Sequence, residues 1–315
     1  MNTKSFSCFA DEGNWYKGNL HSHTTRSDGA ATPEAVVDWY ARHGYDFLAI
    51  TDHDVIVETE DLQRDELLVL PGIEFAYRPD EDPEFFLDML GINLKTLPEF
   101  LDPDGTGKVH YPKNLSPQAI IDAVNDAGAL AIMCHPYYYR NMTEPYLRYH
   151  SYLGIEAYNY VCDETCGRGY HEVYWDAALL RGRKLMGFAT DDSHAPDFGH
   201  AWVEVKAKEK TVPAILEAIR SGSYYSTTGI RIYDVAQHGD KMRITFDRPC
   251  DVVFVTVGWR GMVRSYHNGF ELVDGEKRFY AEYNFTGKEA FMRIELIDST
   301  GKKAYTNPIY PASEE

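Results

Sequence analysis

The sequence has few basic residues relative to acidic ones. Its 315 residues include 31 Lys and Arg against 49 Asp and Glu, so the formal net charge is −18. A general nucleic-acid-binding surface is therefore not expected, because such a surface needs clustered Lys and Arg that displace counterions. A small anionic substrate remains compatible with this charge, since a local site can oppose the global field. In an acidic chain, bound metal ions are the natural source of that local positive charge.

Long apolar runs and a disulfide framework are also absent. No stretch approaches the roughly 18 apolar residues that a membrane helix needs. The N-terminus lacks the basic and then apolar pattern of a secretory signal. The five cysteines are an odd number in a long chain, which does not suggest paired disulfides. We therefore expect a cytoplasmic protein that does not bind a membrane.

The first two-thirds of the chain alternate between strand-like and helix-like segments. Short apolar runs predict strands at residues 15–20, 45–51, 67–71, 129–134, 154–160 and 184–190. Capping residues followed by proline, or helical patterning, predict helices at residues 32–44, 116–128, 168–181 and 211–221. Repeated βα units imply a mainly parallel sheet with right-handed crossovers.

The pattern changes near Gly229. The remaining runs are short, rich in β-branched and aromatic residues, and separated by Gly, Asp or Pro. They predict a small antiparallel β domain of about 80 residues. We thus expect two domains, at residues 1–228 and 229–315. The second carries no recognisable motif, and is a candidate to cover the first, to mediate a homo-oligomer or to bind an unidentified partner.

Candidate metal ligands follow the strand-like runs. His21 and His23 form an H-x-H directly after a strand, which directs both side chains to one face. Further His, Asp and Glu residues stand near the ends of later runs: Asp28, His53, Glu74, His135, Asp192 and His194. In an α/β barrel, active sites are built at the C-terminal edge of the strands. Several clusters at one edge favour a metal site over unrelated loop histidines and capping carboxylates.

The expected ligands combine imidazole with carboxylate and contain no thiolate. This set fits Zn, Mn or Fe and disfavours a structural zinc site of the cysteine type. There are more candidates than one ion can use. We therefore expect two or three divalent ions bridged by a carboxylate, as in hydrolytic metal clusters.

Five segments resemble motifs of the PHP (polymerase and histidinol phosphatase) family in their order: NLHSHTTRSDG, ITDHD, PGIEF, CHP and DDSH. The resemblance spans residues 15–230 and is greatest for the stand-alone metallohydrolase branch, because nothing else of a polymerase is present. It implies a distorted TIM-like (β/α)7 barrel, here followed by the small sandwich-like β domain. It also implies a metal-dependent phosphoesterase that cleaves a small phosphorylated metabolite or nucleotide.

The resemblance assigns roles by position. One ion would be held by His21, His23, Glu74 and Asp192, and Glu74 would bridge to a second ion held also by His135. The remaining residues Asp28, His53 and His194 would form a third corner, either as ligands or as catalytic groups that bind the substrate phosphate. Asp88, in the segment DMLG, occupies the place of a family histidine. A carboxylate there favours a harder ion such as Mn²⁺ or Fe²⁺.

Other polar residues are candidates for substrate binding. Arg26, Arg140 and Arg168 are possible phosphate clamps, because a guanidinium can grip two oxygens at once; the alternative is a solvated loop arginine in each case. Asn159 stands at another strand end and resembles a family position there. The run Tyr137–Tyr139 follows His135 closely, and either forms a wall for a substrate ring or packs as ordinary core.

The expected mechanism is attack on phosphorus by a metal-bridged hydroxide, with His53 or His194 donating a proton to the leaving oxygen. An amide, ester or carbamate hydrolase with the same metal site is the first alternative. A non-catalytic scaffold stabilised by metal is the second. A phosphoesterase should place at least one arginine within reach of the metals, whereas an amide or ester hydrolase could have an apolar, aromatic pocket.

Overall fold

A computed structural model describes residues 5–78, 86–139, 143–194, 198–257 and 262–310. The chain divides into two compact units. The larger unit comprises residues 16–203, and the β-rich unit combines residues 1–15 with residues 204–315. The main segment of the β-rich unit thus begins at residue 204, earlier than the domain boundary expected after residue 228. The expected boundary stays a prediction.

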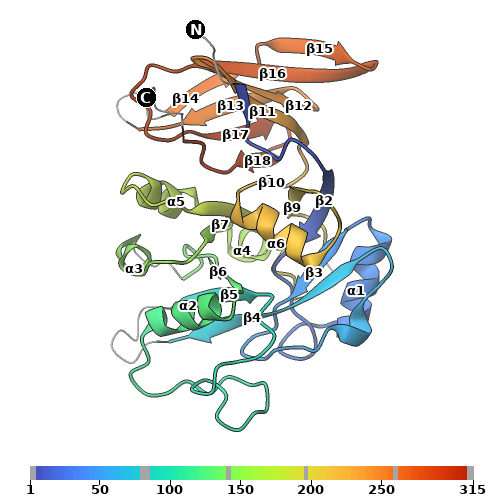
Figure 1. The fold of residues 1–315 in the computed structure, drawn as a ribbon, viewed down its shortest axis with the longest axis vertical. Helices are drawn as coiled ribbons and strands as arrows, with labels where there is room; N and C mark the ends of the chain where they lie inside the picture. The colour runs from blue at the N-terminus through green and yellow to red at the C-terminus, as the bar shows by residue number, and fades with distance from the viewer. Residues whose placement is uncertain (1–4, 79–85, 140–142, 195–197, 258–261, 311–315) are drawn as a thin grey trace. The chain divides into compact units, whose positions relative to one another are not determined.

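The sheet of the larger unit follows chain order. Its strands are β2 (Asn14–Asn19), β3 (Phe47–Ile50), β4 (Leu68–Tyr77), β5 (Leu87–Ile92), β6 (Leu130–Met133), β7 (Gly154–Asn159) and β8 (Met186–Thr190). The pairs β2–β3, β3–β4, β6–β7 and β7–β8 are parallel. The result is a mixed α/β fold with a large sheet that contains parallel strands and has few helices around it (Figure 1).

Strand β5 departs from the expected repetition of βα units. It was not predicted, and it pairs antiparallel with both β4 and β6. Residues 78–86 alone join β4 to β5, whereas a parallel crossover needs a dozen or more residues. A connection of this length fits the antiparallel pairing of β4 with β5.

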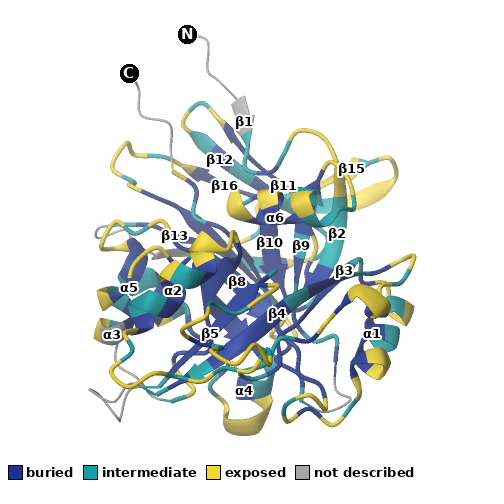
Figure 2. Ribbon diagram, turned by 60° about the horizontal axis from the view of Figure 1, so that its bottom comes forward, coloured by how far each residue is buried: buried dark blue, intermediate teal, exposed yellow. Residues whose placement is uncertain are grey.

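Strand β4 is longer than the apolar run 67–71 indicated. It continues through Pro71 and Gly72 to Tyr77, so Glu74 lies within the strand and not beyond its end. Most of β4 and all of β5 are buried (Figure 2). Burial on both faces fits the continuous apolar run at the start of β4, whereas Asp88 and Gly91 interrupt the apolar run of β5. Glu74 is consequently a fully buried carboxylate.

The predicted helix starts are confirmed where a cap precedes proline. The side chains of Thr32, Ser116 and Thr211 cap α1 (Pro33–Arg42), α2 (Pro117–Asp126) and α6 (Val212–Arg220). The other helical elements are η1 (Glu60–Leu62), α3 (Thr143–Arg148), α4 (Tyr160–Cys166) and α5 (Glu172–Leu179). The helix expected at 168–181 is shorter in the structure, because Tyr170 forms an antiparallel bridge to Tyr158 and α5 begins only after His171. The short helix α4, which Gly167 ends in a left-handed conformation (φ 66°), was not predicted. Within the described residues, no helix is long and apolar enough to cross a membrane.

The segments that follow β2 and β8 are joined through their backbones. Ser22 and Ser193 form a parallel bridge. The His23 N–H donates to the Ser193 carbonyl and the Asp192 N–H donates to the His21 carbonyl, both at 3.1 Å. The ends of the first and last strands of the larger unit therefore meet where the expected ligands lie.

The β-rich unit is built from two series of strands. One runs β1 (Ser5–Ser7), β11 (Ile232–His238), β12 (Lys241–Phe246), β16 (Glu276–Asn284), β15 (Gly269–Val273). The other runs β14 (Met262–Tyr266), β13 (Cys250–Val255), β17 (Arg293–Asp298), β18 (Lys303–Thr306), β10 (Tyr224–Thr227), β9 (Trp202–Ala207). Antiparallel pairs such as β11–β12 and β13–β17 occur where the sequence predicted them. Residues of both series, including Val235, Ile244 and Val252, share one buried core.

Candidate metal centre

The expected ligands converge from several strand ends of the larger unit. Within the described residues, they fall into three overlapping groups, in each of which one potential ligand atom per residue lies within 4.8 Å of the others. We call them the central cluster (His21, His23, Glu74, Asp192), the inner cluster (His21, Glu74, Cys134, His135) and the outer cluster (His23, Asp28, His53, His194). Asp88 is in none of the three.

The central cluster is a closely packed set of two imidazoles and two carboxylates. His21 Nε2 lies 3.0 Å from Glu74 Oε2 and 3.1 Å from Asp192 Oδ1. His23 Nε2 lies 3.1 Å and 3.0 Å from the same two oxygens. All four residues are buried. Four donor atoms thus surround one small space.

The orientation of His21 is set by Glu156, a buried carboxylate on β7 that the sequence analysis did not single out. His21 Nδ1 lies 2.7 Å from Glu156 Oε1. When Nδ1 carries the proton of that hydrogen bond, Nε2 presents its lone pair to the cluster. That lone pair faces His23 Nε2 at only 3.0 Å. Glu156 thereby fixes His21 in the form that can bind a metal.

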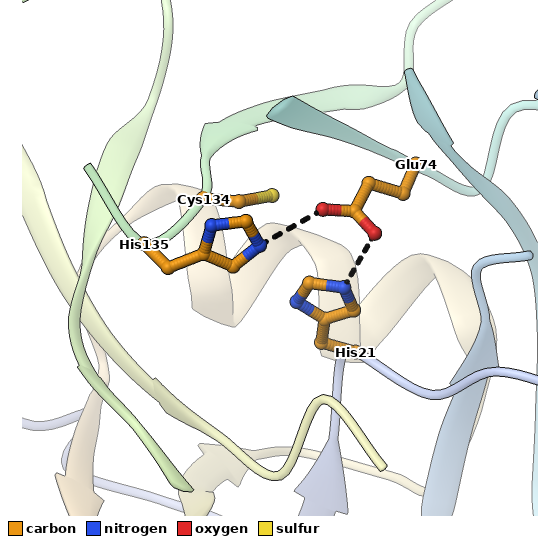
Figure 3. A group of neighbouring side chains, drawn as sticks. All are labelled: His21, Glu74, Cys134 and His135. Carbon is orange, nitrogen blue, oxygen red and sulfur yellow. Dashed lines mark hydrogen bonds and ion pairs between the residues drawn. The ribbon is translucent and has the colours of Figure 1, made fainter. Parts of the chain in front are cut away.

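The inner cluster uses the other oxygen of Glu74. His135 Nε2 lies 3.1 Å from Glu74 Oε1, while His21 approaches Oε2 (Figure 3). Cys134 completes the group and was also not expected, because the predicted ligand set had no sulfur. Burial, together with the nearby carboxylates, raises the pKa of the Cys134 thiol well above its ordinary value. In the metal-free protein this thiol is therefore protonated.

The outer cluster is more open to solvent than the other two. The side chain of Asp28 is 56% exposed, whereas those of His53 and His194 are about half as exposed. Asp28 Oδ1 lies 3.5 Å from His194 Nε2 and Oδ2 lies 3.8 Å from His53 Nε2. The Asp28 pKa is lowered, chiefly by its interaction with His194. An ionised carboxylate beside two imidazoles thus stands at the solvent side of the centre.

The buried imidazoles of the centre retain protons to unusually high pH. Burial alone would lower the pKa of His23, but Asp192 and Glu74 outweigh it and raise this pKa to about 9. The pKa of His135 rises to about 10 for the same reason, through Glu74 above all. Conversely, the imidazoles hold the Glu74 pKa well below its ordinary value despite burial. Protons on these imidazoles balance the carboxylates when no metal is bound.

The donor atoms fit a divalent cation. Asp192 Oδ1 is buried and has no hydrogen-bond partner among the described residues, although two imidazole nitrogens lie about 3 Å away. A buried acceptor without a partner is costly. A metal ion between Asp192 Oδ1, His21 Nε2 and His23 Nε2 would satisfy all three atoms. Imidazole and carboxylate are also the ligands that Zn, Mn and Fe accept.

Asp88 lies on β5 beside the inner cluster, and its oxygens already have partners. Oδ1 accepts a hydrogen bond from Arg78 Nη1 at 2.8 Å, and Oδ2 accepts one from the Tyr139 hydroxyl at 2.6 Å. The structure thus places Asp88 in an ion pair. Its role as a ligand stays a prediction.

The residues expected to bind substrate are dispersed. Asn159 is buried and donates hydrogen bonds to Glu156 at 2.9 Å and to Asp192 at 3.1 Å. It therefore orients these two carboxylates of the centre. Arg168 donates to the Tyr138 carbonyl at 3.2 Å, and Arg26 is exposed. Arg140 lies outside the described residues. Sequence reasoning missed Glu156, Cys134 and Arg78. Cys134 is adjacent to the expected ligand His135, whereas Glu156 and Arg78 are placed by contacts with other segments of the chain.

Comparison with solved structures identifies the fold. A two-domain protein from Bacteroides vulgatus, described as containing a predicted PHP-like metal-dependent phosphoesterase, matches this chain with a TM-score of 0.52 at 16% sequence identity. The match covers 91% of this chain and 92% of that one. The chain has a PHP-like fold. The expected resemblance to the PHP family is thus confirmed in the fold.

Similarity to curated proteins in sequence alone is more limited, and no protein-family model matches the chain. The 5′-3′ exoribonuclease Rnm of Escherichia coli is 42% identical over 64 residues, which are 18% of this chain and 22% of that protein. This chain therefore matches only about a fifth of the exoribonuclease. An uncharacterized protein of Methanocaldococcus jannaschii is 29% identical over 136 residues, 38% of this chain and 68% of that protein.

Proposed function

We propose that the protein is a metal-dependent phosphoesterase that hydrolyses a small phosphorylated metabolite or nucleotide. The observation that carries the proposal is the position of Glu74. One of its oxygens faces His21 and His23, and the other faces His135. A single buried carboxylate can therefore bridge two cations, which is the arrangement that two-metal hydrolases use.

In this proposal, two divalent ions (Zn, Mn or Fe) are shared between the central and inner clusters. The first would be held by His21, His23, Glu74 and Asp192, and the second by Glu74 and His135. Bound ions would activate a water for attack on phosphorus and neutralise charge on the phosphoryl oxygens. The outer cluster is the candidate position for a third ion.

The outer cluster would otherwise act directly on the substrate. The Nδ1 atom of His194 lies 2.8 Å from the Asp192 carbonyl oxygen, so Nδ1 carries a proton and Nε2 is directed towards Asp28. A protonated His194, or His53 on the other side of Asp28, can donate to the leaving oxygen.

The proposal extends to the fold and its domains. We infer that strands β2 to β8 form a distorted barrel, supported by the backbone bridge between Ser22 and Ser193. We also propose that the chain is divided into two domains, at residues 1–228 and 229–315.

The deciding experiment combines metal analysis with a substrate panel. Wild type, His21→Ala and a control, His43→Ala, are loaded with Mn²⁺ or Zn²⁺ and assayed on phosphomonoesters, phosphodiesters, aryl esters and amides. His43 lies at the exposed end of α1, so its loss should change neither property. We expect phosphoester hydrolysis by wild type, and loss of both metal and activity in His21→Ala. Hydrolysis of aryl esters or amides alone would favour the alternative hydrolase, and hydrolysis that survives in His21→Ala would contradict the proposal.

A further inference from the structure

Arg78, the residue directly after β4, is held rigidly beside the inner cluster. Its Nη1 donates to the Tyr77 carbonyl at 3.0 Å and to Asp88 Oδ1 at 2.8 Å, and its Nη2 donates to the Tyr139 hydroxyl at 3.0 Å. The guanidinium carbon also lies 4.5 Å from the ring centre of Phe86 and 5.0 Å from that of Tyr139. Hydrogen bonds and ring contacts together fix its plane.

This guanidinium lies on the face of the sheet that carries Glu74. Alternate residues of an extended strand share a face, so Glu74, Ala76 and Arg78 point to the same side. Asp88 is paired directly opposite Ala76 and points to that side as well. Tyr139 connects the group to the metal ligands, because its ring centre lies 6.0 Å from that of His135.

Part of the hydrogen-bonding capacity of Arg78 is unused. A guanidinium has five N–H donors; among the described residues three of them have partners, which leaves one on Nε and one on Nη2. The side chain is 35% exposed, while that of its partner Asp88 is only 1% exposed. Two donors in a fixed plane are thus presented at the rim of the inner cluster.

The rim is otherwise acidic, since Glu74, Asp88 and Asp192 all lie near it. A cationic side chain at this rim would complement an anionic substrate. Of the arginines expected from sequence, Arg168 donates to a backbone carbonyl and Arg26 is exposed. We propose that Arg78, oriented by Asp88 and Tyr139, binds the anionic group of the substrate at the rim of the inner cluster. The identity of that anion as a phosphoryl group rests on the proposed phosphoesterase function.

The test measures the affinity of the metal-loaded protein for inorganic phosphate by titration calorimetry. Arg78→Gln removes both the positive charge and the paired N–H donors of the guanidinium, whereas Arg78→Lys keeps only the charge. Arg42→Gln is the matched control, because Arg42 also pairs with an aspartate, Asp38, but on the exposed surface of α1. Metal content is measured for every variant, and KM and kcat are measured on a phosphomonoester and a phosphodiester.

We expect Arg78→Gln to weaken phosphate binding by about 10- to 100-fold, the effect of losing a charge-assisted hydrogen-bonded contact. Arg78→Lys should lie in between, and Arg42→Gln should match wild type. KM should rise more for the dianionic monoester than for the monoanionic diester, with metal content unchanged. Unchanged phosphate affinity in Arg78→Gln, absence of phosphate binding by wild type, or loss of metal in parallel with phosphate would each overturn the assignment.

The two proposals can fail separately. If wild type hydrolyses no phosphoester but binds phosphate through Arg78, the proposed reaction is wrong and the anion site stands. If wild type hydrolyses phosphoesters and Arg78→Gln changes neither KM nor phosphate affinity, the reaction stands and the anion site is wrong.

Discussion

Glu156 offers the sharpest test of how the centre is built, because this residue contacts the ligands without belonging to any of the three clusters. Its Oε1 accepts hydrogen bonds from His21 Nδ1 and the Thr190 hydroxyl, both at 2.7 Å. Its Oε2 accepts from the His135 N–H and from Asn159 Nδ2, both at 2.9 Å. Two expected ligands, His21 and His135, and two further residues, Thr190 and Asn159, therefore share a single carboxylate.

The change Glu156→Gln keeps the shape and replaces one oxygen by an NH₂ group. If Oε1 is replaced, His21 faces a donor; if Oε2 is replaced, the His135 N–H faces one. Either orientation leaves a buried donor unsatisfied, which costs about 1–3 kcal/mol of stability. Loss of the acceptor that orients a ligating histidine typically lowers metal affinity about 10- to 100-fold, which corresponds to about 1.4–2.7 kcal/mol.

The assay titrates metal-free protein with Zn²⁺ or Mn²⁺ against a chromogenic chelator, with circular dichroism as the check on folding. Glu295→Gln is the control, because Glu295 is also a buried carboxylate with a partner, Arg293, but in the β-rich unit. It should lower stability and leave metal affinity intact. Metal affinity in Glu156→Gln within twofold of wild type would refute the reasoning that this carboxylate orients His21.

Three other predictions concern the whole protein. The pKa values of His23 and His135 are about 9 and 10, against an ordinary value of 6.5. Their bound protons therefore stabilise the metal-free protein fully below pH 6.5 and no longer do so above pH 9–10. The free energy of unfolding should fall between pH 6.5 and pH 10, and a flat profile would contradict the raised pKa values. Removal of metal by a chelator should lower the melting temperature at constant pH, because an ion that binds only the folded state stabilises that state by mass action. Equal melting temperatures before and after chelation would argue against a resident ion. Gly187→Ala should cost about 1–3 kcal/mol in urea denaturation, because the added Cβ would lie 2.3 Å from the buried ring of Trp175; wild-type stability would show that the ring can move.

Local sequence signals predicted most of the centre. His21, His23, His135 and Asp192 follow strands that end in recognisable apolar runs, and a parallel arrangement brings such ends together. Each of these residues could be identified from its neighbours in sequence alone.

The remaining members depend on contacts between distant segments. Glu156 lies inside a strand, where its neighbours give no indication that it pairs with a histidine 135 positions away. Arg78 and Asp88 meet only because β5 returns antiparallel, and β5 was not predicted because Asp88 and Gly91 interrupt its apolar run. Long-range pairing that local propensity does not encode therefore limits what the sequence predicts about the site.

The backbone bridge between Ser22 and Ser193 has a consequence for folding kinetics. It joins the segment that carries His21 and His23 to the one that carries Asp192, more than 160 residues later. Contacts of such high sequence separation form slowly, because a long loop must close first. On the ribosome, the central cluster cannot assemble until the chain beyond residue 193 has emerged. Metal uptake in a refolding experiment should thus mark one of the last steps, after most secondary structure has formed.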